Sequence, residues 1–107
     1  MFNLIKNLLS PRNLGLSRST SWRKVRKEFL KKNPVCAVTG SKKKLEVHHI
    51  IPFHISPELE LEESNLITLS RRSKGSNIHL LFGHYGNYKK DNPNIVKEAR
   101  EWNKKLN

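Results

Sequence analysis

Two adjacent histidines lie inside a strand-like run at Leu45–Pro52, whose sequence is LEVHHIIP. The apolar and β-branched residues of this run favour a strand, and Pro52 ends it because proline cannot donate to a strand ladder. Successive side chains of a strand point to opposite faces. We therefore expect His48 and His49 to face different sides, unless the strand bulges or ends there.

A second strand-like run follows at Asn65–Leu69, and a short helix is predicted around His79. Asn65 heads the second strand, where its amide can bridge two backbone segments. His79 lies in a helical pattern that apolar neighbours would tie to the core. A neutral imidazole there could ligate a divalent ion together with His48. The sequence thus predicts a strand, a strand and a short helix, in that order.

His84 lies five residues after His79, which is about 140° round an ideal helix, so the two are not expected to share a face. Only a left-handed conformation at Gly83 would place His84 on the same side as His79. We therefore rank His79 well above His84 as a ligand, and keep His84 as a secondary candidate for a metal or phosphate contact. His54, in a loop, is expected to be an ordinary polar side chain.

The charge of the chain indicates its class of partner. Lys and Arg number 21 against 9 Asp and Glu, which gives a net charge of +12. Such a basic chain is expected to bind a polyanion. Nucleic acid fits better than a membrane, because no apolar run approaches the roughly 18 residues that span a bilayer. We also find no export signal, since Met1–Leu9 is short and interrupted by Lys6, and therefore expect a cytoplasmic protein.

A chain of 107 residues is expected to form one domain, which we place at residues 20–107. Residues 1–19 are predicted to be an N-terminal arm, either flexible and lying along phosphates or an ordinary leader. The domain should open with a helix that has Thr20 or Ser21 as its N-cap and ends at Asn33, before a proline. The last helix should have Asn92 as its N-cap and an apolar stripe at Ile95, Ala99, Trp102 and Leu106.

Charged residues cluster in three further segments. The acidic stretch Glu58–Glu63 could hold a metal, but its loop character favours a solvated connection. The first helix carries a basic face, and basic loops precede the first strand and follow the second. We expect these cations to contact the phosphates of the nucleic-acid backbone. The residues expected to do so are Arg23, Lys24, Lys27, Lys43, Arg71 and Arg72.

Together, the runs LEVHHIIP at 45–52 and NLITL at 65–69 and the later His79 resemble the HNH family of nucleases, in particular its small stand-alone members. The resemblance covers residues 20–107 in outline. It implies an α+β fold with a ββα-metal core, also called a His-Me finger. In that core a two-stranded antiparallel ribbon and a short helix grip one metal ion, and helices flank it on the N- and C-terminal sides.

The resemblance also implies a role for each site residue. His49 matches the general base and Asn65 matches the asparagine that steadies it. His48 and His79 match the metal ligands.

The chain departs from many relatives, which bind a structural zinc through two pairs of cysteines. Cys36 is the only cysteine; it has no partner at Thr39, and Ser70 stands where a later cysteine is common. No structural zinc is therefore expected.

These residue types suit phosphodiester hydrolysis. An imidazole that titrates near neutrality can take a proton from water, and a divalent ion can polarise the phosphate. A carboxylate-lined two-metal site is hard to build, because Asp91 is the only aspartate. We expect an endonuclease that acts on double-stranded DNA with one divalent ion, which the sequence leaves open among Mg²⁺, Mn²⁺, Zn²⁺ and Ni²⁺.

Cleavage of both strands would favour a homodimer or a larger protein partner. Two other functions stay open. One is a non-catalytic nucleic-acid-binding module with a structural metal, and the other is a basic scaffold protein that needs no metal.

Overall fold

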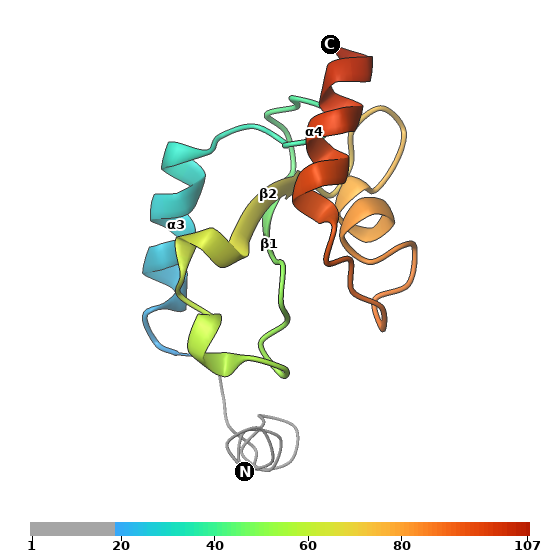
Figure 1. The fold of residues 1–107 in the computed structure, drawn as a ribbon. Coiled ribbons are helices and arrows are strands. Elements are labelled where there is room, and N and C mark those ends of the chain that lie inside the picture. Colours follow the sequence, from blue (N-terminus) through green and yellow to red (C-terminus); the bar gives the residue numbers. More distant parts are fainter. Residues whose placement is uncertain (1–18) are drawn as a thin grey trace.

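The computed structural model describes residues 19–107 (Figure 1), so the predicted N-terminal arm lies outside the described residues apart from Ser19. Helix α3 (Trp22–Lys32) is followed by strand β1 (Leu45–His49), strand β2 (Leu66–Ser70), a π-helical turn η3 (His79–Gly83) and helix α4 (Ile95–Leu106). Two short 3₁₀ turns, η1 (Pro57–Leu59) and η2 (Glu63–Asn65), connect the strands. The fold is α+β, and the predicted order of strand, strand and short helix is confirmed.

Strands β1 and β2 form an antiparallel ribbon in which His48 lies opposite Ile67 and His49 lies opposite Leu66. Residues that face each other across a ribbon share a face. One face therefore carries His48 and Ile67, and the other carries His49 and Leu66. The ring of His48 contacts His79 of η3, whereas the ring of His49 packs on Trp22 of α3. The two histidines point to opposite sides, as the alternation of the strand predicts.

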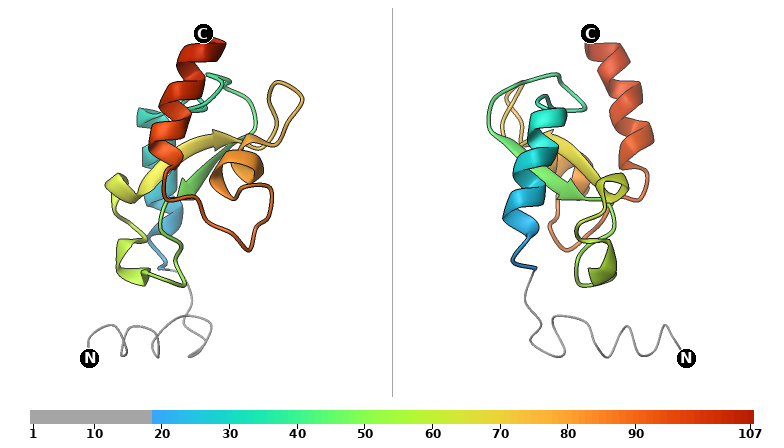
Figure 2. Two further views of the ribbon diagram at one scale, coloured as in Figure 1. Left: turned by 45° about the vertical axis from the view of Figure 1, so that its right-hand side comes forward. Right: turned by 90° about the vertical axis from the view of Figure 1, so that its left-hand side faces the viewer.

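Helix α3 covers the face of the ribbon that carries His49 (Figure 2). Phe29 is buried against Val47 and Leu66, and Trp22 and Val25 pack at the edge of this cluster. Their helical spacing explains why this stretch forms an amphipathic helix. The helix has Ser21 as its N-cap and Asn33 as its C-cap, as predicted.

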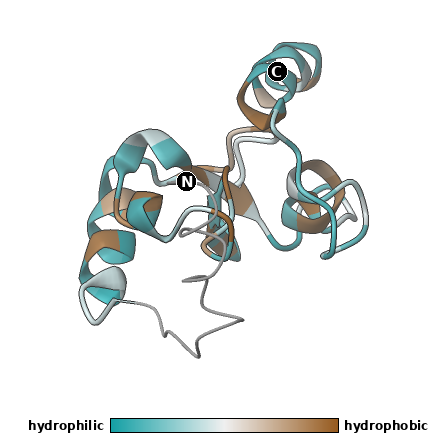
Figure 3. Cartoon of the chain, turned by 60° about the horizontal axis from the view of Figure 1, so that its bottom comes forward, coloured by the Kyte–Doolittle hydropathy of each residue, from teal (hydrophilic) through white to brown (hydrophobic). Residues whose placement is uncertain are grey.

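Helix α4 and η3 cover the opposite face. The core here is buried and contains Cys36, Val38, Ile67, Leu69, Ile78, Ile95 and Ala99. Figure 3 shows hydrophobic and hydrophilic residues on different sides of the helices. The stripe predicted on α4 is buried only in its first half, since Trp102 is 43% exposed and packs edge-on against Phe82. No helix within residues 19–107 is long and apolar enough to span a bilayer.

The last helix begins at Ile95 with Asn94 as its N-cap, so the prediction of Asn92 as the cap is wrong. Asn92 is fully buried and has a different role. Its Oδ1 accepts hydrogen bonds from the Tyr85 hydroxyl and the Asn94 N–H, and its Nδ2 donates to the Phe82 carbonyl. The side chain therefore ties the segment that follows η3 to the start of α4.

Hydroxyl groups of Thr39 and Ser70 make hydrogen bonds at one end of the ribbon. Thr39 Oγ1 lies 2.9 Å from Ser73 Oγ, within hydrogen-bond distance. Ser70 is fully buried, and its Oγ donates to the carbonyl of Lys43. These bonds join the loop before β1 to the segment that follows β2.

A matched pair of leucines tests the position of the core. Leu69→Ala removes a fully buried side chain, whereas Leu81→Ala changes one that is 50% exposed. We expect the first substitution to lower the free energy of unfolding by about 2–5 kcal/mol and the second by less than about 0.5 kcal/mol. Urea unfolding followed by circular dichroism measures both, and equal losses would place the core elsewhere.

Candidate active site

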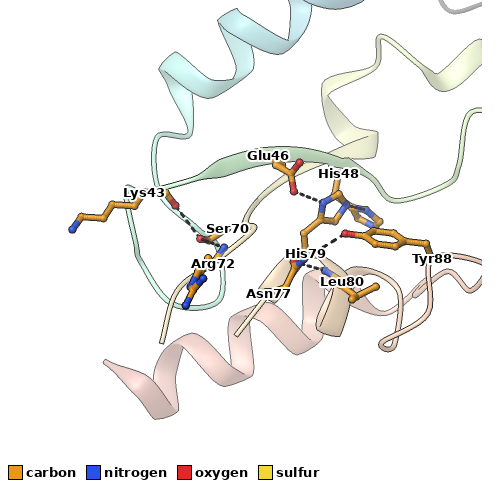
Figure 4. Close-up of polar contacts among 9 residues, drawn as sticks. All are labelled: Lys43, Glu46, His48, Ser70, Arg72, Asn77, His79, Leu80 and Tyr88. Carbon is orange, nitrogen blue, oxygen red and sulfur yellow. Dashed lines mark hydrogen bonds and ion pairs between the residues drawn. The ribbon is translucent and has the colours of Figure 1, made fainter. Parts of the chain in front are cut away.

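Three histidines from different parts of the chain converge on one point. His48 comes from β1, His79 opens η3 and His84 directly follows it. One ligand nitrogen from each lies within 4.8 Å of the other two. Nδ1 of His48 is 3.0 Å from Nε2 of His79, close to the separation of two ligands that share an ion at metal–nitrogen distances of about 2.0–2.1 Å. We call these three residues the histidine group; Figure 4 shows how His48 and His79 meet.

The prediction that His79 and His84 do not share a face is wrong, because η3 is not an α-helix. In a π-helix each turn holds an additional residue, so residues five apart come to lie on the same side. The rings of His79 and His84 are 5.1 Å apart. Gly83 is not left-handed, as the sequence argument required; the residues with positive φ come later, at Tyr85 and Gly86.

Gly83 is needed at its position because the histidines approach it closely. A Cβ atom built there would lie 3.1 Å from Cε1 of His48 and 3.2 Å from Cδ2 of His79. Any larger residue would push the imidazoles away from the positions that they occupy. The absent side chain of Gly83 thus makes room for the histidine group.

Outer hydrogen bonds fix the orientation of two rings of the group. Nδ1 of His79 lies 3.0 Å from the carboxylate of Glu46, and Nδ1 of His84 lies 2.8 Å from the carbonyl of Lys90. Each oxygen accepts, so Nδ1 carries the proton and Nε2 carries the lone pair that a metal needs. Glu46 was not predicted, although it lies two residues before His48 and hence on the same face of β1.

The environment keeps His48 and His79 neutral. Burial lowers the pKa of His48 to about 3, helped by the nearby histidines. Burial also lowers the pKa of His79, and its hydrogen bond to Glu46 partly opposes this shift. Nε2 of His48 is buried and makes no hydrogen bond within residues 19–107. A buried nitrogen of this kind costs about 1–3 kcal/mol. The nitrogen of His48 that faces His79 is Nδ1 rather than Nε2, so it is the neutral state of the two imidazoles that suits a metal ion.

His49 lies outside the histidine group but lines the same cleft. This cleft has a volume of about 320 Å³, and its wall also includes His54, Tyr88 and Asp91, which sequence reasoning did not place at the site. Nε2 of His49 donates to the carbonyl of Glu60 at 2.9 Å. In the neutral ring the lone pair is therefore on Nδ1. His49 is 9% exposed, so the protein holds most of the ring in place.

Asn65 fastens the loop that follows His49. Its Oδ1 accepts from the N–H of Ile51 at 2.8 Å, and its Nδ2 donates to the carbonyls of Ile51 and Leu59. Leu59 directly precedes Glu60, whose carbonyl holds His49. Glu60 is only 4% exposed, so the prediction of a solvated acidic connection is wrong at this residue.

The six cations predicted to contact the nucleic-acid backbone are all exposed: Arg23, Lys24, Lys27, Lys43, Arg71 and Arg72. Three lie on α3 and three lie in the loops at the ends of the strands. Their exposure leaves them accessible to a polyanion, and their role stays a prediction.

A ribbon and a helical turn that together present a group of histidines define the ββα-metal class of fold. Residues 34–72 match the family model described as HNH endonuclease. This match includes both strands, His48, His49 and Asn65, and it confirms the resemblance to the HNH family seen in the sequence. No curated protein and no solved structure gives a significant match.

Removal of His84 tests whether the site has three ligands. Loss of a residue that only hydrogen-bonds to a ligand weakens metal binding by roughly 10–100-fold. His84→Ala would remove a ligand itself, so it should weaken the binding of Zn²⁺ or Ni²⁺ by more than this. His54→Ala, which changes the same cleft outside the group, is the matched control. Competition with a chromophoric chelator measures both affinities. Equal affinities in the two variants would remove His84 from the site.

The lowered pKa of His48 predicts how stability without metal depends on pH. Between pH 6.5 and about 3 the unfolded chain binds a proton at His48 that the folded chain does not. Stability should therefore fall as the pH drops below 6.5, by at most about 1.4 kcal/mol per pH unit from this residue. Urea unfolding in a chelator from pH 7 to 5 measures the slope, and His48→Gln should flatten it. An unchanged slope in this variant would contradict the burial of a neutral His48.

Proposed function

We propose that this protein is an endonuclease that hydrolyses the phosphodiester bonds of DNA with one divalent ion and a histidine general base. His48, His79 and His84 would hold the ion, and His49 would act as the base. The observation that carries this proposal is the arrangement of one cleft, in which three histidines converge while His49 lines the wall without joining them. The HNH match, which includes His48 and His49 but ends before His79, supports nuclease chemistry.

The number of ligands favours catalysis over a structural metal. Structural zinc sites are closed by four protein ligands, whereas catalytic sites use three and leave a position open. Within residues 19–107 the group has three members. The carboxylate of Asp91 is 4.0 Å from Nδ1 of His84, on the side of that ring that bonds Lys90 rather than the group. An open position supports a nuclease over a module that only binds nucleic acid.

His49 is oriented for proton transfer. The Glu60 carbonyl accepts from Nε2 whether the ring is neutral or charged, so transfer of a proton from water to Nδ1 would leave that bond unchanged. Such a base contributes about 10²–10⁴-fold to the rate. Asn65 holds the loop that carries this carbonyl, and Trp22 packs on the ring at 4.4 Å, so both would position the base. A bound divalent ion would polarise the phosphate and stabilise the leaving oxygen.

The donor set narrows the choice of metal. All three members of the group are imidazoles, which suit Zn²⁺, Ni²⁺, Cu²⁺ and Fe²⁺, whereas Mg²⁺ and Mn²⁺ prefer oxygen ligands. Of the four ions left open by the sequence, we therefore propose Zn²⁺ or Ni²⁺ over Mg²⁺ or Mn²⁺.

We propose double-stranded DNA as the substrate. Contacts from the exposed cations of α3 and the loops to phosphates would dominate affinity and make it depend steeply on salt. One cleft acts on one strand, so nicking should precede cleavage of both strands. A second copy of the chain, or a larger partner, would supply the second cut.

Nicking of supercoiled plasmid tests the general base. The wild-type protein with Ni²⁺ or Zn²⁺ should relax the plasmid, and His49→Ala should lower the rate by about 10²–10⁴-fold. Because His49 is outside the histidine group, metal uptake and DNA binding should persist in this variant. Asn65→Ala should lower the rate less and leave metal uptake close to that of the wild type.

Two results would contradict the proposal. One is equal nicking by the wild type and His49→Ala with every metal tried. The other is a wild-type protein that binds the ion and DNA but cleaves no phosphodiester.

A further inference from the structure

A second pocket, lined by cations, lies at the end of the ribbon away from His48. It has a volume of about 410 Å³ and is lined by Lys44, Arg71, Arg72, Gly75, Ser76 and Asn77. Three of these side chains are basic and none is acidic. A pocket with this lining suits an anion that spreads its charge over several oxygens, as a phosphate does.

The backbone around this basic pocket is shaped by residues with positive φ. Lys44 has φ 50°, and its carbonyl accepts from the N–H of Arg71 at 2.7 Å. Lys74 and Gly75, with φ 52° and 77°, form the tip of a two-residue turn between Ser73 and Ser76, which exchange two backbone hydrogen bonds. Positive φ is uncommon for lysine and tends to be kept where function needs it.

Asn77 and Tyr88 join the basic pocket to the histidine cleft. Asn77 lines the pocket, and its Nδ2 donates to the hydroxyl of Tyr88 at 3.5 Å. Tyr88 lines the cleft, with its ring 5.0 Å from that of His84. Figure 4 shows Arg72, Asn77 and Tyr88 on one side of β1, with His48 and His79 next to Tyr88. Glu46 lies between the two sites, but its carboxylate is bonded to His79.

We propose that the basic pocket binds a backbone phosphate of the same nucleic-acid strand whose scissile phosphate enters the histidine cleft, an inference that rests on the proposed function. The strand rises about 3.3 Å per residue, so Leu45, which follows Lys44, and His48 are about 10 Å apart along β1. The rise of about 3.4 Å per nucleotide is measured along the duplex axis. Successive phosphates of one strand lie farther apart than this because they wind around the axis, so the bound phosphate would lie only a few nucleotides from the cut. The contact is to phosphate, so it carries no sequence preference.

Binding to a labelled DNA duplex, measured by fluorescence anisotropy in EDTA, tests the pocket without any catalysis. Lys44→Gln/Arg72→Gln removes two charges from the pocket, and Lys97→Gln/Lys104→Gln removes two exposed charges from α4. The pocket variant should bind about tenfold more weakly, and the slope of log affinity against log salt should fall by about 1, as for one lost phosphate contact. The α4 variant should keep the wild-type slope.

Equal losses of affinity and slope in the two variants would overturn the proposal. If Lys44→Gln disturbs the end of the ribbon, as a changed circular dichroism spectrum would show, Arg71→Gln/Arg72→Gln keeps Lys44 in place and carries the same expectation.

Activity on two substrates separates this inference from the proposed function. Bis(p-nitrophenyl) phosphate is a phosphodiester too small to reach the basic pocket from the cleft. The pocket variant should hydrolyse it at the wild-type rate but cleave DNA more slowly at low DNA concentration. An equal loss on both substrates would mean that the substitutions act through the cleft, and would overturn the inference. A wild-type protein that hydrolyses neither substrate would contradict the proposed function. The binding experiment in EDTA would still test whether the basic pocket binds a DNA phosphate.

Discussion

The site depends on the close approach of β1 and η3, where the rings of His48 and His79 meet. Their facing nitrogens are 3.0 Å apart, and Gly83 favours this approach because a Cβ atom there would be in tight contact with both rings. The π-helical winding of η3 then adds His84 to the pair. A close backbone contact, rather than a long loop, thus brings the three members of the histidine group together from two short elements.

One strand supplies both kinds of histidine because its side chains alternate. His48 points toward η3 and the other members of the histidine group, and His49 points toward α3 and the Glu60 carbonyl. Each ring therefore has its own supporting element, and a shift of register by one residue would exchange their environments. Buried apolar residues on both faces of the ribbon, Val47 and Leu66 on one face and Ile67 and Leu69 on the other, favour this register.

The sequence predicted the ribbon, the flanking helices and the opposite orientation of the two histidines, because these follow from local periodicity. The prediction that His79 and His84 do not share a face was wrong, since a helical sequence pattern does not distinguish an α-helical turn from a π-helical turn. Sequence reasoning also missed Glu60, whose carbonyl reaches His49 only through the folding of the loop that Asn65 fastens. Glu46 could have been found from alternation along β1, whereas the Lys90 carbonyl that orients His84 leaves no signal in the sequence.

The distribution of charge links metal loading to substrate binding. His48 and His79 are kept neutral by burial, so within the site itself the positive charge for a phosphate would have to come from the ion. The fixed positive charge of the protein lies outside, on α3 and in the loops at the ends of the ribbon. These cations would hold a DNA backbone whether or not the ion is present. A neutral centre inside a basic surface therefore separates the affinity for DNA from the activation of a single phosphate, and only the second would depend on the metal.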